Sequence, residues 1–257
     1  MRRASAPRTG TAGATGTGAR RMAAARAGMG VQFQIPPQDH PRLPPGQPQD
    51  RRAQSLQRQP AHADVQRHAA PDLGVNWLTL YAFSTENWKR STEEVLGLMG
   101  IFARYIRREA DAMSAEGVRM RFIGGRERLD PRLQRLMAGI EARTACNSRL
   151  NLTVAINYGG RDEIARAAAR MAERIARGEI QAPTEADFAA CLDTAGQPDP
   201  DLVIRTSGET RTSNFLPYQA AYSEYEFTPT LWPDFTPDHL AAILDRFGLR
   251  DRRFGGA

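Results

Sequence analysis

The order of hydrophobic and amphipathic segments after residue 70 constrains the fold more than any other feature of this sequence. Short runs rich in β-branched and aromatic residues alternate with segments whose apolar residues recur every three or four positions. The expected strands are 75–84, 118–125, 150–160 and 201–209, with a weaker fifth at 225–230. The expected helices are 91–117, one beginning at 130, 162–177, 184–194 and one beginning at 236. This alternation predicts an α/β fold, a single domain with a mainly parallel β-sheet flanked by helices.

Residues 1–70 have a different composition. They hold 11 Arg and 3 Asp but no Glu, and nine Val, Ile, Leu, Met or Phe against eight Pro and nine Gln. Their net charge is +8, whereas residues 71–257 carry −2, so the basicity of the chain belongs to this segment. Such a composition cannot bury enough apolar surface to offset chain entropy. We interpret residues 1–70 as a low-complexity Arg/Pro/Gln-rich segment, either disordered or read from a shifted frame, ahead of a folded domain at 71–257.

Two functional interpretations of this segment are weaker. An Arg-rich, acid-poor leader is compatible with an organellar transit peptide, but it has two serines and no clear amphipathic helix. An Arg-rich tail can bind nucleic acid, but arginines without interleaved aromatic residues are a weak indication of such a function. We therefore expect no nucleic-acid partner.

The folded domain has few residues for thiol, metal or triad chemistry. Cys146 and Cys191 are the only cysteines and lack metal-site spacing, which is typical of a reducing compartment and favours a cytoplasmic protein. Three of the four histidines precede residue 71, and His239 alone cannot supply a His-ligated metal site. No apolar run reaches the roughly 18 residues that a membrane span requires. The chemistry must therefore come from carboxylates, arginines, asparagines and hydroxyls.

The stretches that follow the expected strands form the candidate site, because ligands of parallel sheets bind beyond the carboxyl ends of the strands. These stretches are STENWKR, GGRER, NYGGRDE and RTSGETRTSN. Arg205, Arg211 and Ser213 combine two guanidiniums and a hydroxyl around a glycine-containing loop, which suits phosphate oxygens. Taken singly, each arginine could instead pair with Glu209 or Glu224 on the surface. Several arginines at one edge favour the anion site.

A polyphosphate bound by arginine commonly carries Mg²⁺, for which Glu86, Glu209 and Glu224 are the candidate carboxylates at this edge. The GxxxxGK[ST] element is absent, which excludes a P-loop nucleotide site. Trp88 fits two roles, since its ring could stack on a flat or allylic group or anchor the core.

Four longer stretches resemble the cis-prenyltransferase family, whose bacterial members include undecaprenyl diphosphate synthase. They are YAFSTENWKRSTEEV, INYGGRDEI, DLVIRTSGETRTSNFLPYQAAYSEYEFTPTLWPDF and the terminal RRFGG, within a nearly continuous match over residues 71–257. The resemblance implies the cis-prenyltransferase fold and repeated cis addition of isopentenyl diphosphate to an allylic diphosphate. The product would be a cis-polyprenyl diphosphate, a lipid carrier for cell-wall glycan synthesis. It further implies Mg²⁺, a homodimer, and a cytoplasmic protein that touches the membrane surface.

The same resemblance implies roles for individual residues. Asn87 would be the catalytic residue that assists proton removal, and Glu224 would be the Mg²⁺ ligand. Arg253 and Gly255 match an R-x-G element that in relatives reaches the diphosphate of the partner subunit. The implied substrate-binding residues are Ser84, Thr85, Glu86, Trp88, Arg90, Arg205, Arg211, Ser213, Arg253 and Gly255.

The N-terminal segment departs from the family pattern. Relatives begin with a strand that leads into a MDGNGRW-type loop, whose Asp binds Mg²⁺ and the primer diphosphate. Residues 36–52 read PPQDHPRLPPGQPQDRR, in which nothing around Asp39 or Asp50 supplies that loop. We therefore expect the first strand and the catalytic loop to be missing and the activity to be low. A divergent relative, a shifted reading frame and a non-catalytic prenyltransferase-like binding subunit remain open.

Overall fold

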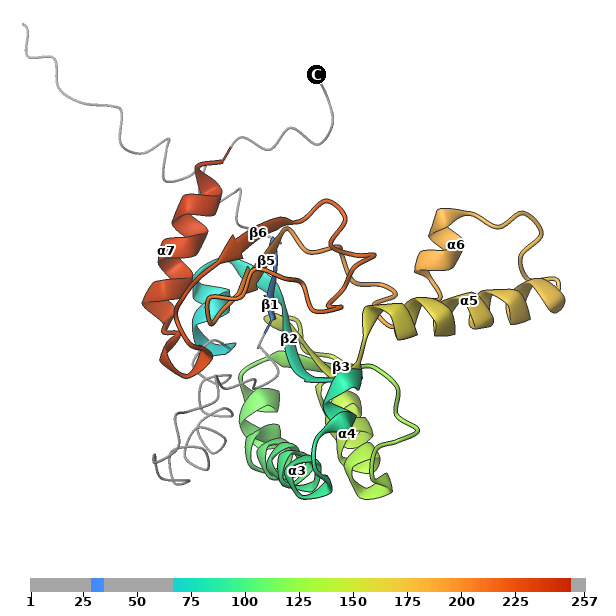
Figure 1. Cartoon of the computed structure of the whole chain (residues 1–257), viewed down its shortest axis with the longest axis horizontal. Coiled ribbons are helices and arrows are strands. Elements are labelled where there is room, and N and C mark those ends of the chain that lie inside the picture. Colours follow the sequence, from blue (N-terminus) through green and yellow to red (C-terminus); the bar gives the residue numbers. More distant parts are fainter. Residues whose placement is uncertain (1–28, 35–66, 251–257) are drawn as a thin grey trace, which may run out of the picture.

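The computed structural model describes residues 29–34 and 67–250, and in these ranges the chain forms one six-stranded sheet with helices around it (Figure 1). All neighbouring strands are parallel, in the order β3-β4-β2-β1-β5-β6. The strands are β1 (Met29–Gln34), β2 (Val75–Ser84), β3 (Val118–Ile123), β4 (Leu150–Tyr158), β5 (Leu202–Arg205) and β6 (Glu224–Phe227). The predicted α/β fold is confirmed, and each of the five strands expected after residue 70 is present.

Strand β1 corrects one prediction, because it occupies the place in the sheet that was expected to be missing. Phe33 is paired with Leu80 of β2 on one side and with Ile204 of β5 on the other. Without β1, the facing N–H and C=O groups of β2 and β5 would lack ladder partners in the middle of the sheet. The sequence MGVQFQ alternates apolar and polar residues as a strand does, but it is only six residues long and lies in a segment whose composition is typical of disorder.

The catalytic loop of relatives would follow this strand, at residues 35–66. These residues lie outside the described ranges, so the absence of the loop stays a prediction from the sequence. The interpretation of residues 1–70 as disordered or frame-shifted also stays a prediction for residues 1–28 and 35–66, which lie outside the described ranges.

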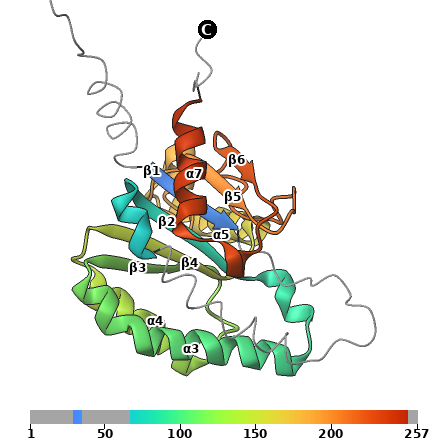
Figure 2. The same cartoon turned by 90° about the vertical axis from the view of Figure 1, so that its left-hand side faces the viewer.

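Helices α3 (Thr92–Ala115) and α4 (Pro131–Thr144) cover one face of the sheet beside β3 and β4, as Figure 2 shows. Both begin at the caps that the sequence predicts. The Ser91 hydroxyl and the Asp130 carboxylate each accept a hydrogen bond from a backbone N–H of the first turn. These caps satisfy helix donors that have no partner within the helix.

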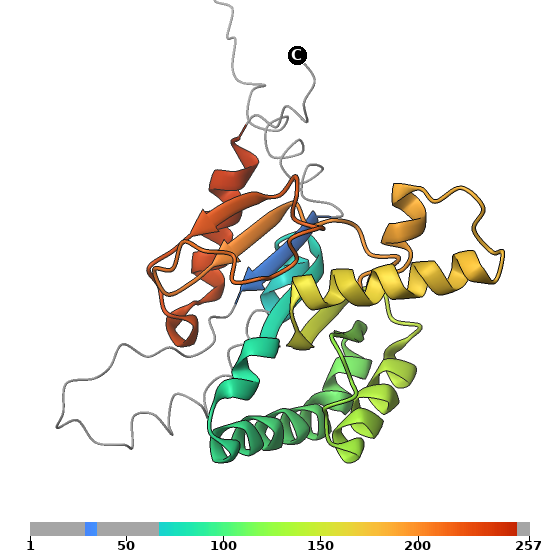
Figure 3. The same cartoon turned by 45° about the vertical axis from the view of Figure 1, so that its right-hand side comes forward.

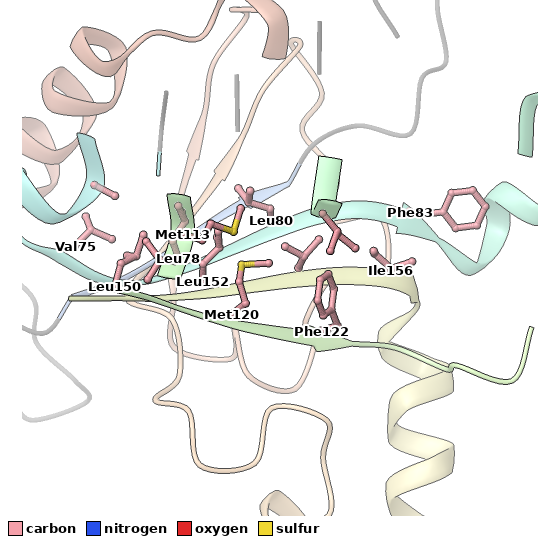
Figure 4. Packing of buried hydrophobic residues seen from close by; sticks show 14 of the residues in the cluster. Val75, Leu78, Leu80, Phe83, Met113, Met120, Phe122, Leu150, Leu152 and Ile156 are labelled. Carbon is pink, nitrogen blue, oxygen red and sulfur yellow. The ribbon is translucent and has the colours of Figure 1, made fainter. Parts of the chain in front are cut away.

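The main core lies between this helix layer and the sheet (Figure 4). Leu78 and Leu80 of β2 point to the same face as Met120 and Phe122 of β3, because side chains two residues apart on a strand share a face. Met113 of α3 packs into this layer and is fully buried. The core fixes the strands whose carboxyl ends carry the candidate site.

Three further α-helices follow α4 along the chain. Helix α5 (Gly160–Ala176) begins directly after β4 and, with the short α6 (Glu185–Ala189), projects away from the sheet (Figure 3). Helix α7 (Pro237–Gly248) packs apolar residues into the main core near β5 and β6. In residues 29–34 and 67–250, no helix has the length and apolar character to cross a membrane.

The packed region begins before residue 71. Residues 67–72 are helical, Ala70 is fully buried and Arg67 is 1% exposed. The Arg67 guanidinium forms ion pairs with Glu109 of α3 at 3.5 Å and with Glu116, the residue that follows this helix. Residues 67–70 thus pack with the domain, although their composition groups them with the leader.

Candidate functional site at the carboxyl edge of the sheet

The ends of β2, β4 and β5 bring most of the predicted site residues to one edge of the sheet. Ser84, which ends β2, is paired with Tyr158, which ends β4. Arg205, which ends β5, is paired with Gln34, which ends β1. The turn 85–90 and the loop 206–216 follow β2 and β5 directly. We call this region the carboxyl edge.

Arg205 combines burial with unpaired hydrogen-bond donors. Its side chain is 1% exposed, and its Nη2 donates to the Ser213 Oγ at 3.4 Å. Within the described ranges, its buried Nε and Nη1 have no hydrogen-bond partner. Burial lowers the pKa of the guanidinium, Glu209 opposes this effect and Arg211 adds to it. A buried cation with free donors is costly until an anion reaches it, so Arg205 fits a bound diphosphate.

The loop after β5 holds Arg211 and Ser213, the two residues that the sequence predicts to bind an anion together with Arg205. Ser213 has a φ of 47° and Ser207 a φ of 71°, in the left-handed region that non-glycine residues seldom occupy. Strained backbone of this kind persists where surrounding contacts fix it, and it is concentrated at functional sites. Arg211 is exposed and pairs with Glu209, which is the surface salt bridge considered as the alternative to anion binding. The structure therefore brings Arg205 and Ser213 into contact and places Arg211 in the same loop.

Asn87 closes the turn after β2, which forms the 3-10 helix η1 (Thr85–Lys89). Its Oδ1 accepts a hydrogen bond of 2.7 Å from the backbone N–H of Ser84, and the side chain is 7% exposed. Glu86 on the same turn is exposed. Burial raises the pKa of the Glu86 carboxyl, but hydrogen bonds from its own backbone N–H and from neighbours including Asn214 bring it below the usual value. The turn thus presents an ionised carboxylate at the carboxyl edge.

Trp88 contacts the ends of three strands. Its Nε1 donates to the Asn157 Oδ1 at 2.6 Å, and its ring meets the ring of Phe83 edge-on with centroids 5.2 Å apart. The Arg128 guanidinium lies over the indole, 4.5 Å from the ring centroid. These contacts are those of an anchor, the second role considered for this residue, and substrate binding by Trp88 stays a prediction. Arg90 ends the turn half-buried, with no side-chain hydrogen bond or ion pair to the described residues.

Glu224 lies at the other end of the sheet, so its expected place at the carboxyl edge is wrong. It is the first residue of β6 and is paired with Leu202, the first residue of β5, whereas Arg205 is paired with Phe227. Three residues of a strand span about 10 Å. The Glu224 carboxylate also binds Arg250 at 2.6 Å. A residue that precedes a parallel strand lies at the amino edge, and its role as an Mg²⁺ ligand stays a prediction.

Of the three candidate carboxylates, Glu86 and Glu209 follow the strand ends at the carboxyl edge. Glu209 is paired with Arg211, whereas Glu86 accepts a hydrogen bond from a neutral amide. The described residues hold no cluster of three or more acidic, His or Cys side chains. Mg²⁺ in phosphate sites commonly takes one or two carboxylates and completes its shell with substrate oxygens and water, which Glu86 fits. Arg253 and Gly255 lie outside the described residues.

Two asparagines that the sequence did not single out tie the strand ends together. Asn157, with a φ of 51°, accepts from Trp88 and donates its Nδ2 to the Gly125 carbonyl at 2.7 Å. Asn214, with a φ of 62°, donates its Nδ2 to the Glu86 Oε1 at 3.2 Å. Asparagine enters the left-handed region more readily than most residues. That preference marks turns, but it does not identify the distant segments that these amides contact.

A buried polar network supports the ends of β4 and β3. Glu163 of α5 is fully buried and accepts hydrogen bonds from the Tyr158 hydroxyl at 2.6 Å and the Gln219 amide at 3.0 Å. Burial and the Glu163 carboxylate raise the pKa of Tyr158 well above its usual value. Asp193 binds both Nη atoms of Arg166 at 2.7 Å. Burial raises the pKa of Asp193, but the bonds from Arg166 outweigh it and bring the pKa below its usual value.

Comparison with known proteins gives a consistent result. The sequence profile described as "Putative undecaprenyl diphosphate synthase" matches residues 53–255. The isoprenyl transferases of Agrobacterium fabrum and Rhizobium meliloti are 48% and 46% identical to the chain over 189 residues, 73% of the chain and 76% of each relative.

Two solved structures extend this comparison. Lavandulyl diphosphate synthase from Lavandula x intermedia, in complex with dimethylallyl diphosphate, aligns with a TM-score of 0.80 and 29% identity. That alignment covers 90% of this chain and 99% of the plant protein. A probable undecaprenyl diphosphate synthase from Campylobacter jejuni aligns with a TM-score of 0.72 and 27% identity, over 88% of this chain and 98% of that one.

Proposed function

The chain belongs to the undecaprenyl diphosphate synthase family of cis-prenyltransferases, and on this premise we propose that it adds isopentenyl diphosphate to an allylic diphosphate. Members of this family are enzymes that transfer prenyl groups onto isopentenyl diphosphate. The observation that supports the proposal in this chain is the buried Arg205, whose Nε and Nη1 lack partners among the described residues at the carboxyl edge. The product is a cis-polyprenyl diphosphate that serves as a lipid carrier for cell-wall glycan synthesis.

In this proposal the loop after β5 binds isopentenyl diphosphate. Arg205 supplies unpaired N–H groups, and Ser213 lies 3.4 Å from its Nη2. Charge-assisted hydrogen bonds of this kind are roughly twice as strong as neutral ones. Arg211 reaches the same anion by exchanging Glu209 for a diphosphate oxygen. The diphosphate that leaves belongs to the allylic primer, and stabilising the charge that develops on it would be the main electrostatic contribution to catalysis.

The turn after β2 binds the allylic primer through Ser84, Thr85 and Glu86. The Asn87 Oδ1 is already bonded to a backbone N–H, so its Nδ2 is the atom left to face the substrates. An amide is a very weak base, and Asn87 would therefore orient the group that accepts the proton rather than remove the proton itself. Trp88 lies within this turn and Arg90 ends it.

Mg²⁺, when bound, neutralises charge on the departing diphosphate. Glu86 would hold it together with diphosphate oxygens. Glu224 lies at the amino edge and is bound to Arg250, so opening that ion pair alone would not bring it to the same ion.

Turnover is expected to be low in this chain while diphosphate binding is retained. The sequence between residues 35 and 66 contains no MDGNGRW-type loop, so the carboxylate that relatives use at the primer diphosphate has no counterpart there. The same absence favours a second candidate, a non-catalytic prenyltransferase-like binding subunit. A weakly active enzyme and a non-catalytic subunit would both bind diphosphates, but only the enzyme would turn over substrate.

The proposal extends to assembly and location. Arg253 and Gly255 are proposed to reach the diphosphate of a second subunit in a homodimer, which size-exclusion chromatography with light scattering tests. A cytoplasmic enzyme with a polyprenyl product is also proposed to touch the bilayer surface. Co-sedimentation with anionic lipid vesicles measures that contact.

The proposed function is tested by binding and turnover measured on the same protein. Calorimetric titration with isopentenyl diphosphate in Mg²⁺ gives the affinity, and radiolabelled isopentenyl diphosphate with dimethylallyl or farnesyl diphosphate gives the turnover. Arg205→Ala should weaken binding about 10- to 100-fold, the range of a charged hydrogen-bond pair. Arg143→Ala, which removes an exposed ion pair with Asp111 on the helix layer, should leave binding unchanged.

Three outcomes decide between the possibilities. If the wild type and Arg205→Ala bind isopentenyl diphosphate with equal affinity, the proposal that Arg205 binds its diphosphate is refuted. Turnover like that of a full-length relative would refute the expectation of low activity. Binding without any turnover would favour the non-catalytic subunit.

A further inference from the structure

Asn214 joins three segments that follow three different strands. Its backbone carbonyl accepts a hydrogen bond from the Gly160 N–H at 2.8 Å, and its Oδ1 accepts one from the Arg161 N–H at 2.9 Å. Both N–H groups belong to the first turn of α5, after β4. Its Nδ2 donates to the Glu86 Oε1 at 3.2 Å in the turn after β2, while Asn214 itself lies in the loop after β5. Every polar atom of this side chain thus contacts a different segment.

The start of α5 depends on this distant residue. The position that caps the helix is Gly159, which has no side chain to accept from the first-turn N–H groups. Asn214 provides the acceptor instead. A Cβ at Gly159 would lie 2.6 Å from the Thr85 Oγ1 and 2.9 Å from the Asn214 Nδ2, so the glycine lets the loop and the turn approach.

Asn214 directly follows Ser213, which forms the anion clamp together with Arg205. Asn214 has a φ of 62° and its neighbour Ser213 a φ of 47°, both left-handed. Ser213 accepts the hydrogen bond from Arg205. A shift of the Asn214 side chain therefore moves the Ser213 hydroxyl relative to the guanidinium. The neutral amide of Asn214 donates to the Glu86 carboxylate, a contact that a carboxylate at position 214 could not make.

We propose that Asn214 is a positioning residue that couples the Arg205–Ser213 anion clamp to the Ser84–Asn87 turn by bonding Glu86 and capping α5. This inference rests on the proposed function, because it assigns the clamp to a substrate diphosphate. Its consequence is that the affinity of the clamp depends on the polarity of the contact between residues 214 and 86. A residue that only stabilised the fold would not show that dependence.

The test uses a pair of substitutions that reverse the polarity of this contact. Asn214→Asp keeps an acceptor for the Arg161 N–H, and a negative charge there suits a helix N-terminus, so the melting temperature should stay near that of the wild type. Its second oxygen faces the Glu86 carboxylate and repels it. Adding Glu86→Gln restores a donor and an acceptor in the opposite order.

The measurement is calorimetric titration of the full chain with inorganic pyrophosphate in the absence of divalent metal. Asn214→Asp should weaken binding about tenfold in the wild-type background but only about twofold in the Glu86→Gln background. Glu86→Gln alone is measured as the fourth corner of the cycle. Asn214→Gly keeps the left-handed backbone and loses both side-chain bonds, and it should weaken binding without adding charge.

A matched control separates position from charge. Thr210→Asp adds the same charge to the exposed part of the same loop, and its effect on binding should be equal with Glu86 and with Gln at position 86. Equal coupling to Thr210→Asp and to Asn214→Asp would overturn the proposal, because charge alone would then explain it.

The remaining outcomes distinguish this inference from the proposed function. If Arg205→Ala abolishes pyrophosphate binding while Asn214→Gly and Asn214→Asp bind as the wild type does, the positioning role is refuted and the clamp stands. If Arg205→Ala binds pyrophosphate as well as the wild type, or the wild type does not bind it, the clamp is refuted and this inference with it.

Discussion

Replacing Arg205 by methionine is expected to stabilise the fold while abolishing diphosphate binding. Arg205 ends β5 and is 1% exposed, and its buried Nε and Nη1 have no partners in the described ranges. Each buried, unsatisfied donor costs roughly 1–3 kcal/mol. Replacing poorly paired buried ions by apolar side chains of similar volume stabilises proteins by roughly 1–4 kcal/mol. We expect the free energy of unfolding to rise by about 2 kcal/mol.

Urea unfolding with and without pyrophosphate, followed by circular dichroism, measures both effects. At 100 times its dissociation constant, pyrophosphate should add about 2.7 kcal/mol to the stability of the wild type and nothing to that of Arg205→Met. Arg166→Met is the matched control, because both Nη atoms of Arg166 bind Asp193 at 2.7 Å. That variant should lose about 3 kcal/mol, since it leaves a carboxylate without its partner. If Arg205→Met loses stability as Arg166→Met does, the reasoning that Arg205 is an unsatisfied, ligand-binding cation is wrong.

Three other predictions concern the support of the site. Gly160→Ala should lower the free energy of unfolding by about 1–3 kcal/mol in urea titrations, because its Cβ would lie 2.0 Å from a proline ring; Gly139→Ala, with open space around it, should not lose stability. The pKa of Asp193 in the folded chain lies below the ordinary value of 3.8, so its contribution is present above that pH and is lost as the pH falls through the folded value. Urea titrations across this acid range should therefore show a smaller pH dependence for Asp193→Asn, and an equal slope would contradict the assignment. Trp88→Phe keeps the aromatic packing but removes the 2.6 Å hydrogen bond, and it should cost about 1–3 kcal/mol; a variant of unchanged stability would show that this bond contributes nothing.

Local sequence patterns were sufficient to predict most strands and helices and the contact between Arg205 and Ser213. The strand 75–84 and the cap at Ser91 depend on residues close together in the sequence, and both are present. The meeting of Arg205 with Ser213 at the carboxyl edge also followed from local order, because both residues belong to one strand and the loop after it. These features were predictable since parallel strands always present the same end to one edge.

Long-range pairing decided the features that were missed. The segment MGVQFQ alternates apolar and polar residues, but it is short and the composition around it is typical of disorder; it becomes β1 because β2 and β5 offer it two rows of backbone partners. Glu224 was misplaced although the expected strand 225–230 already puts it before a strand, and the register with Leu202 shows that it lies at the amino edge. Asn214 was overlooked because its three partners come from segments that only the folded sheet brings together.

By itself, the sequence determined that this chain builds a parallel α/β sheet with arginines and hydroxyls after its strands, because hydrophobic periodicity and strand-end chemistry are local properties. The tertiary structure alone decided which of these groups face one another and which are paired. It left Arg205 buried with two donor atoms that lack partners among residues 29–34 and 67–250, bound Glu224 to Arg250 and set Asn214 between two strand ends. The physical reason is that burial, register and hydrogen-bond partners depend on contacts between residues far apart in the chain, which no local pattern encodes.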